Sequence, residues 1–358
     1  MDHSDRIFIH GVSLPELQEW ITQAGEQKYR AMQIWEWLYH HQVEDWDGMK
    51  NLPKTLREKL SSSFVFAALE RESVQESETG TRKILCRLTD GELIEEVLIP
   101  AADRRTVCVS SQVGCMFGCA FCASGQLGVK RNLKAGEIVG EVLAAQREYG
   151  DRITNVVFMG IGEPFDNYDE VIRAVRILND PDGVCLGARR ITISTCGVVP
   201  GIQRLEDEGL QVELSVSLHA PNDTTRDALM PVNVSWSLEE LMETCRIYTL
   251  RTKRIITFEY TMIRGINDTE QDLADLIVLL TRFPCRVNLI PLSEIEEYDG
   301  RTSKRETVEK FINRLEKAGI NTTVRWSKGV DVNAACGQLR SKSMGNSLRM
   351  KPVPQQSL

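Results

Sequence analysis

Residues 106–122 of the 358-residue chain read TVCVSSQVGCMFGCAFC, and this stretch decides which fold to expect. A β-branched run, residues 106–110, leads into a loop with three cysteines spaced C-x3-C-x2-C. Three thiolates at this spacing can hold three irons of a [4Fe–4S] cluster and leave the fourth iron open to a further ligand. The residues alone leave a zinc knot as the alternative, completed by a distant cysteine such as Cys108 or Cys336.

Beyond this loop, apolar β-branched runs alternate with amphipathic stretches of helical periodicity. The runs occupy residues 106–110, 153–159, 190–196, 212–218, 254–263 and 285–290. The helical stretches occupy residues 134–149, 169–179, 199–209, 238–250, 269–283 and 304–318. Alternating strands and helices predict an α/β fold with a parallel sheet. Six such units are two short of a complete (βα)8 barrel, so a partial barrel and a doubly wound sheet both fit the periodicity.

The first 100 residues have a different pattern. Ser13 and Glu16 fit a capping box at the start of a helix, and helical periodicity follows. Residues 64–100 are strand-like, and Asp90-Gly91 between two apolar runs is a hairpin signal. We therefore expect four regions. They are a helical N-terminal domain (1–63), a β-hairpin linker (64–100), the main body (101–340) and a disordered tail (341–358).

Composition is that of an ordinary globular protein, with 26% charged residues and a net charge of -8. No run approaches the length of a membrane span, and the first ten residues lack an apolar signal core, so we expect a cytoplasmic protein. Ten cysteines in a reducing compartment favour metal or redox chemistry over structural disulfides. Only His219 lies beyond residue 41, which favours sulfur as the metal ligand.

The charge is unevenly distributed. Residues 1–100 contain 11 basic and 18 acidic side chains, whereas the remainder is near balance. Residues 325–358 contain six basic side chains and one acidic one. A solvated tail explains this excess of positive charge as well as a tail that contacts phosphates does. The candidate phosphate contacts are this tail, Lys130, Arg131, Arg189 and Arg190.

Four motifs complete a resemblance to a known family. They are CVSSQVGC at 108–115, MGIGEP at 159–164, SLHAPN at 217–222 and DVNAACGQL at 331–339. With the three cysteines after the first strand, they resemble the RlmN family, in the RlmN/Cfr group of the radical S-adenosylmethionine (SAM) superfamily. The resemblance runs from about residue 15 to 340. It implies a partial (βα)6 TIM-like barrel and an enzyme that methylates adenine C2 in 23S rRNA and tRNA.

The resemblance also implies cofactors and partners. One [4Fe–4S] cluster would be held by Cys115, Cys119 and Cys122, and two SAM molecules would be used per turnover. The partners would be 23S rRNA, tRNA and an electron-donating reductase such as a flavodoxin. A monomer is expected, with no membrane and no DNA partner.

A covalent carrier makes this reaction possible. Adenine C2 is electron-poor and cannot displace a methyl group from SAM. The resemblance implies that the Cys336 thiolate takes that methyl group, and that a SAM-derived radical then activates it for addition to C2. Cys108 would attack the Cys336 sulfur, release the RNA and leave a transient disulfide for a reductant to reopen. Taken singly, both cysteines would instead be buried core residues.

The remaining site residues follow from the resemblance and from strand alternation. The family's proton acceptor falls on Glu95, and alternation places Glu95 and Val97 on one strand face and Glu96 on the other. Glu96 is an adjacent rival, and a solvated strand edge would explain both glutamates. The expected SAM-binding residues are at strand ends, where barrel sites form. They are Gly162, Glu163, Ser194, Ser217, Leu218, His219 and Ser293, the last where the family commonly has asparagine.

Three other functions remain open. A Cfr-like enzyme would methylate adenine C8 with the same cysteines, although the accessory domain and residues 331–334 favour C2. A radical SAM enzyme acting on a small molecule or peptide would not require both Cys108 and Cys336. A zinc- or cluster-stabilised RNA-binding module would leave the residues at the strand ends unexplained.

Overall fold

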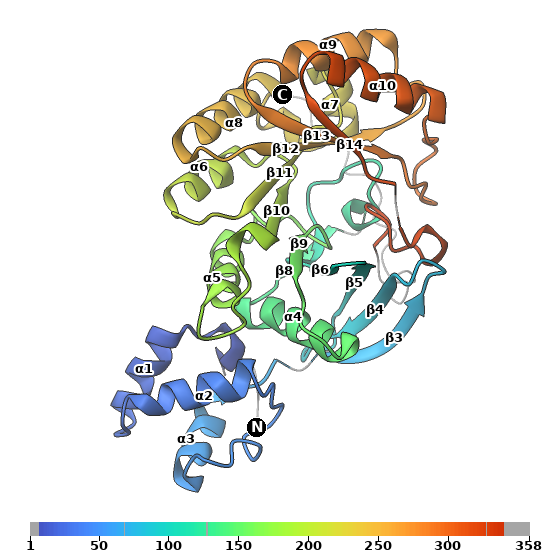
Figure 1. Ribbon diagram of the computed structural model, residues 1–358. Helices are drawn as coiled ribbons and strands as arrows, with labels where there is room; N and C mark the ends of the chain where they lie inside the picture. The colour runs from blue at the N-terminus through green and yellow to red at the C-terminus, as the bar shows by residue number, and fades with distance from the viewer. Residues whose placement is uncertain (1–6, 68, 127, 327, 340–358) are drawn as a thin grey trace, which may run out of the picture.

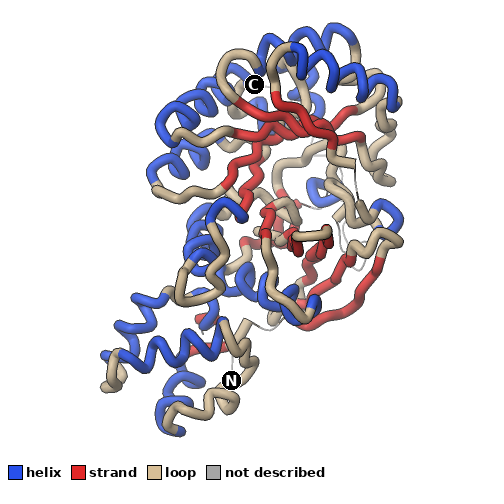
Figure 2. The backbone as a smooth tube through the Cα atoms, in the orientation of Figure 1, coloured by secondary structure: helices blue, strands red, loops and turns tan. Residues whose placement is uncertain are grey.

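The structure is a computed structural model that describes residues 7–67, 69–126, 128–326 and 328–339 (Figure 1). Residues 341–358, expected to be disordered, lie outside the described residues, as does most of the basic tail. A small helical unit at the N-terminus lies at one end of the molecule, beside a strongly curved sheet with helices on its outer face (Figures 1 and 2).

The N-terminal unit consists of α1 (Leu14–Gln23), α2 (Tyr29–Tyr39) and α3 (Lys54–Ser63), closed by the short parallel strands β1 (Ile7–Phe8) and β2 (Phe64–Val65). The predicted capping box is confirmed, because the Ser13 amide donates to Glu16 Oε2 at 2.8 Å and the Glu16 amide donates back to Ser13 Oγ. The unit docks closely against the main body. A Cβ at Gly11 would lie 2.8 Å from the amide nitrogen of Gly136, so only glycine fits there.

A ten-stranded sheet forms the main body. Its order is β14-β13-β12-β11-β10-β9-β6-β5-β4-β3. The parallel strands are β6 (Arg104–Cys108), β9 (Asn155–Phe158), β10 (Ile191–Thr195), β11 (Glu213–Ser217), β12 (Ile256–Met262), β13 (Cys285–Pro291) and β14 (Asn321–Val324). Strands are added in one direction from β6, which is the winding of a partial barrel and excludes the doubly wound alternative. The strand β14 was not among the predicted runs, because its sequence NTTV is short and largely polar.

The predicted hairpin is part of this same sheet. The strands β3 (Glu70–Glu76), β4 (Arg82–Arg87) and β5 (Leu93–Ala101) are antiparallel, and β5 pairs with β6. Two further strands, β7 (Gln112–Cys115) and β8 (Gly128–Asn132), pair as a separate ribbon around the cysteine loop. The segment between the N-terminal unit and the main body therefore extends the barrel wall.

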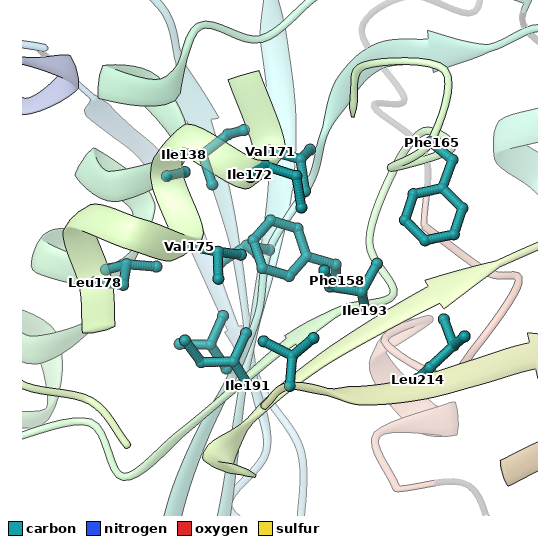
Figure 3. Packing of buried hydrophobic residues seen from close by; sticks show 14 of the residues in the cluster. Ile138, Phe158, Phe165, Val171, Ile172, Val175, Leu178, Ile191, Ile193 and Leu214 are labelled. Carbon is teal, nitrogen blue, oxygen red and sulfur yellow. The ribbon is translucent and has the colours of Figure 1, made fainter. Parts of the chain in front are cut away.

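Helices cover the outer face of the sheet (Figure 2). The α-helices described in the main body are α4 (Ala135–Tyr149), α5 (Tyr168–Asn179), α6 (Val199–Asp207), α7 (Asp223–Leu229), α8 (Leu238–Thr252), α9 (Glu270–Leu280) and α10 (Arg305–Lys317). Figure 3 shows part of the core, where Val171 and Val175 of α5 pack against Phe158 and Ile191. Among the described residues, no helix is both long and apolar enough to cross a membrane.

Candidate active site

The carboxyl ends of β9 to β13 surround one cavity, here called the strand-end cavity. Most of the residues predicted to bind SAM line it, whereas Leu218 is fully buried and does not line it. The predicted residues in its lining are Gly162, Glu163, Ser194, Ser217, His219 and Ser293, with Cys115, Cys119, Cys122 and Cys336. The fold therefore brings together six segments that are far apart in the sequence.

The three closely spaced cysteines lie in a tightly constrained loop. Gly114 has φ +82°, and a Cβ there would lie 1.9 Å from the carbonyl oxygen of Gly128 on the facing strand. Burial raises the pKa of the Cys115 thiol to about 12 and also raises the pKa values of Cys119 and Cys122. Such thiols stay protonated at neutral pH unless a metal stabilises their thiolates.

The three cysteines match the ligand number of a [4Fe–4S] cluster that has one open iron. Within the part of the chain that the structure describes, no group of three or more His, Cys, Asp or Glu side chains is gathered to hold one metal ion. A [4Fe–4S] cluster binds each cysteine through a different iron, so its ligands are more widely spaced. The three cysteines nevertheless line one cavity.

Glu163 is held by backbone amides at the end of the loop after β9. Its Oε2 accepts from the Cys196 amide at 2.7 Å and its Oε1 accepts from the Phe165 amide at 3.0 Å, while burial raises its pKa. Its own amide donates to Oε1 of Gln112 at 2.9 Å. Gln112 is fully buried and was not predicted as a site residue. The Glu163 carboxyl and the nearby serine hydroxyls offer the acceptors and donors that the polar groups of SAM require.

His219 is a neutral hydrogen-bonding group. Its Nδ1 accepts from the Thr261 amide at 2.9 Å, which leaves the ring proton on Nε2. Burial lowers the pKa of His219 to about 3. Its backbone is in the left-handed region, with φ 55°, and its carbonyl accepts from Asn267 Nδ2 at 2.7 Å. The site therefore contains an uncharged imidazole whose Nε2 can donate a hydrogen bond.

Two buried ionisable residues, Glu259 and Arg226, and the half-buried Arg325 were not predicted as residues of this site. Glu259 lies inside β12 and accepts from Asn288 Nδ2 at 3.0 Å, and Arg325 follows β14 and lies 3.1 Å from the Met159 sulfur. Arg226 has no exposed surface and donates to carbonyl oxygens at the ends of β10 and β11. A glutamate inside an apolar strand run was the one local signal available, because ionised side chains are rarely buried without a partner.

A second cavity, here called the lateral cavity, lies between β5, β6, β14 and the segment 328–339. Its lining is Val97, Ile99, Ala101, Arg104, Thr106, Cys108, Met159, Asn288, Thr323, Val324, Arg325, Trp326, Lys328, Ala334, Ala335, Cys336 and Leu339. Cys108 lines this cavity, whereas Cys336 lines both cavities. Both thiols are free. Burial, with the nearby Cys336 sulfur, raises the pKa of Cys108 to about 12, and the positive charge of Arg325 opposes this rise.

The two adjacent glutamates of β5 have different surroundings, as alternation predicted. Glu95 is buried and its Oε1 lies 3.3 Å from Lys83 Nζ, on the face of β5 that Val97 shares. Glu96 is also buried, and burial raises its pKa to about 8, with Arg147 and Glu148 of α4 as its charged neighbours. Glu95 does not line either cavity, but it is on the same face of β5 as Val97 and Ile99, which line the lateral cavity. Glu96 is on the opposite face of the strand.

Two of the candidate phosphate contacts are engaged within the protein. Lys130 pairs with Glu92 at 2.7 Å, and Arg131 pairs with both Asp90 and Glu137. These ion pairs tie the β4–β5 turn to the loop that follows the cysteines.

Two family models match the chain. The radical SAM superfamily model matches residues 109–277, and the model for the ribosomal RNA large subunit methyltransferase N-terminal domain matches residues 8–66. A relative from Staphylococcus saprophyticus, described as a probable dual-specificity RNA methyltransferase RlmN, is 45% identical over 337 residues, 93% of each chain. A relative of the same description from Geobacillus kaustophilus is 45% identical over 344 residues, 95% of this chain and 94% of its own. The crystal structure of a radical SAM methyltransferase from Sphaerobacter thermophilus has 46% identity and a TM-score of 0.90, covering 93% of this chain and 99% of its own.

Proposed function

Because the chain belongs to the RlmN family of dual-specificity RNA methyltransferases in the radical SAM superfamily, we propose that it methylates adenine C2 in 23S rRNA and tRNA through a methylated Cys336. The observation that carries this proposal is the position of Cys336 in the linings of both cavities, with Cys108 in one of them. A carrier residue must face the methyl donor first and the acceptor afterwards.

Cys115, Cys119 and Cys122 would hold one [4Fe–4S] cluster, and the strand-end cavity would bind SAM. When bound, these groups supply the one-electron chemistry that activates the methyl group on Cys336. We expect two SAM molecules per turnover, a flavodoxin-type reductase as electron donor and a cytoplasmic monomer.

Cys336 acts first, as a nucleophile. A sulfur lone pair forms a bond to the methyl carbon of SAM, the bond from that carbon to the SAM sulfur breaks, and the thiol proton goes to solvent. The fixed positive charge of Arg325 is beside the Cys336 sulfur, whose negative charge is the largest contribution raising the pKa of Arg325.

Glu95 and Cys108 act on the adduct between Cys336 and the base. Glu95, whose Oε1 lies 3.3 Å from Lys83 Nζ, takes the proton from the adduct carbon. The Cys108 sulfur attacks the Cys336 sulfur, a disulfide forms and the bond from the Cys336 sulfur to the methylene carbon breaks. The electron pair of that bond stays on the carbon, which takes up the proton given up by the Cys108 thiol and becomes the methyl group, so the methylated RNA is released. A thiol reductant then supplies two electrons and two protons to restore both thiols.

Nucleoside mass spectrometry tests this function on rRNA and tRNA from cells that carry the wild-type gene, no gene, or Cys336→Ala. We expect 2-methyladenosine to disappear from both RNAs in the last two strains. Loss of 8-methyladenosine would assign the enzyme to the Cfr-like reaction, and no change in any methylated adenosine would refute an RNA substrate. Cys185→Ala is the matched control, because that thiol is exposed and does not line either cavity.

A further inference from the structure

The charge of the lateral cavity differs from that of the whole chain. Its volume is about 650 Å³, and its lining contains Arg104, Arg325 and Lys328 but no acidic residue. The chain as a whole has a net charge of -8. A cavity whose charged side chains are all positive, in an acidic protein, concentrates positive potential where an anionic ligand would enter. The phosphates of RNA carry the matching charge.

The inner walls of the lateral cavity are apolar. Val97, Cys108, Ala334 and Leu339 form a small buried cluster separate from the main core, with Met159 packed against it. These side chains also line the cavity. Aliphatic and sulfur-containing walls suit the flat faces of a nucleobase taken out of its stack. The two sulfurs assigned to carrying and releasing the methyl group are part of this lining.

An exposed indole forms part of the same lining. Trp326 follows β14 and is 54% exposed, although aromatic residues make up only 6% of the chain. The guanidinium carbon of Arg305 lies 6.0 Å from the centre of its ring. An exposed aromatic face beside basic side chains is the typical platform for an unpaired base. Arg104 and Lys328, also exposed, supply the positive charge around it.

We propose that the lateral cavity receives the extruded target adenosine, that Trp326 stacks on an adjoining base, and that Arg104 and Lys328 contact RNA phosphates. The inference rests on the proposed function, since it takes an RNA adenosine as the methyl acceptor. Cys336 then meets SAM in the strand-end cavity and the adenosine in the lateral cavity, so the two substrates do not compete for one space. Glu95 lies at the end of the β5 row that faces the adenosine.

Separating RNA binding from the first methyl transfer tests this assignment. Full-length protein is assayed with a tRNA transcript for affinity at several salt concentrations, for 2-methyladenosine formation, and for S-methylation of Cys336 by intact mass. The variants are Trp326→Ala, Trp326→Phe, Arg104→Glu and Lys328→Glu. Lys317→Glu is the control for charge reversal, because Lys317 is an exposed lysine in the last turn of α10 and lines neither cavity.

Trp326→Ala should weaken RNA binding about tenfold, and Trp326→Phe should restore most of it, because phenylalanine keeps a stacking face. Each charge reversal should weaken binding and lower the salt slope by about one, as loss of one phosphate contact does. S-methylation of Cys336 should stay at the wild-type level in all four variants. Lys317→Glu should behave as wild type in every measurement.

Two outcomes would overturn the inference. In the first, the Trp326, Arg104 and Lys328 variants bind and methylate RNA as well as Lys317→Glu does. The other is loss of Cys336 methylation in these variants, which would mean that SAM also uses the lateral cavity. Failure of the proposed function is distinguishable from both, because the wild-type protein itself would then form no methylated adenosine in RNA.

Discussion

Replacing Arg226 with methionine should destabilise the barrel at the point where SAM is expected to bind. The Arg226 side chain is fully buried. It donates to the carbonyl oxygens of Cys196 at 2.8 Å, Ser217 at 3.1 Å and Leu218 at 3.1 Å, and to Oδ1 of Asn233 at 2.7 Å. One guanidinium therefore connects the ends of β10 and β11 to the turn after α7. Methionine fills similar space and leaves all four acceptors without this donor.

The change in the free energy of unfolding caused by Arg226→Met follows from two opposing contributions. Leaving a buried acceptor without its donor costs about 1–3 kcal/mol, and the costs at four neighbouring acceptors are not additive. Burial lowers the pKa of Arg226, which shows that desolvating its charge opposes folding, and methionine removes this penalty. We expect a net loss of about 3 kcal/mol in the free energy of unfolding. For a chain of this length, that loss lowers Tm by roughly 4 °C.

Urea unfolding followed by circular dichroism measures this change in protein without cluster or SAM. Arg176→Met is the matched control, because Arg176 is about half exposed and pairs with Glu208 on the surface, where a pair contributes about 1 kcal/mol or less. Arg226→Lys should be intermediate, since it keeps the charge but fewer donors. A change for Arg226→Met as small as that for Arg176→Met would refute the role assigned to this guanidinium.

Three further perturbations test other parts of the site. The folded pKa of Glu96, about 8, lies above its unfolded value near 4.5, so the wild-type protein loses stability as pH rises between these values. Glu96→Gln should therefore gain stability over wild type from pH 5 to pH 8 in urea titrations, and a constant difference would contradict this. Lys83→Met should remove the ion pair that positions the Glu95 carboxyl group and lower the rate of 2-methyladenosine formation roughly tenfold in a single-turnover assay; an unchanged rate would show that the ion pair does not position the base. Gly114→Ala should abolish iron binding after anaerobic reconstitution, because its Cβ would collide with the facing strand β8, whereas Gly118→Ala, which has open space, should retain iron. Equal iron content in the two variants would argue against the constraint on the loop.

Signals from residues close together in the sequence were sufficient to predict much of the fold and part of the site. Strand and helix periods depend on neighbouring residues, so the six predicted strand–helix units coincide with observed elements. The three cluster cysteines were found because their spacing lies within one loop. The different environments of Glu95 and Glu96 were also predictable, because adjacent residues of a strand point to opposite faces whatever the rest of the fold does.

Sequence by itself thus determined the six strand–helix units, the cysteine loop and the two faces of β5. Tertiary structure alone decided that the hairpin joins the main sheet, that β14 extends it, and that Arg226, Glu259 and Arg325 are gathered at the site. It also decided that Cys336 lines two cavities at once. The physical reason is that strand pairing and side-chain burial join residues far apart in the chain. No local spacing shows that a charged side chain will be buried, or which partner will offset the cost of burying it.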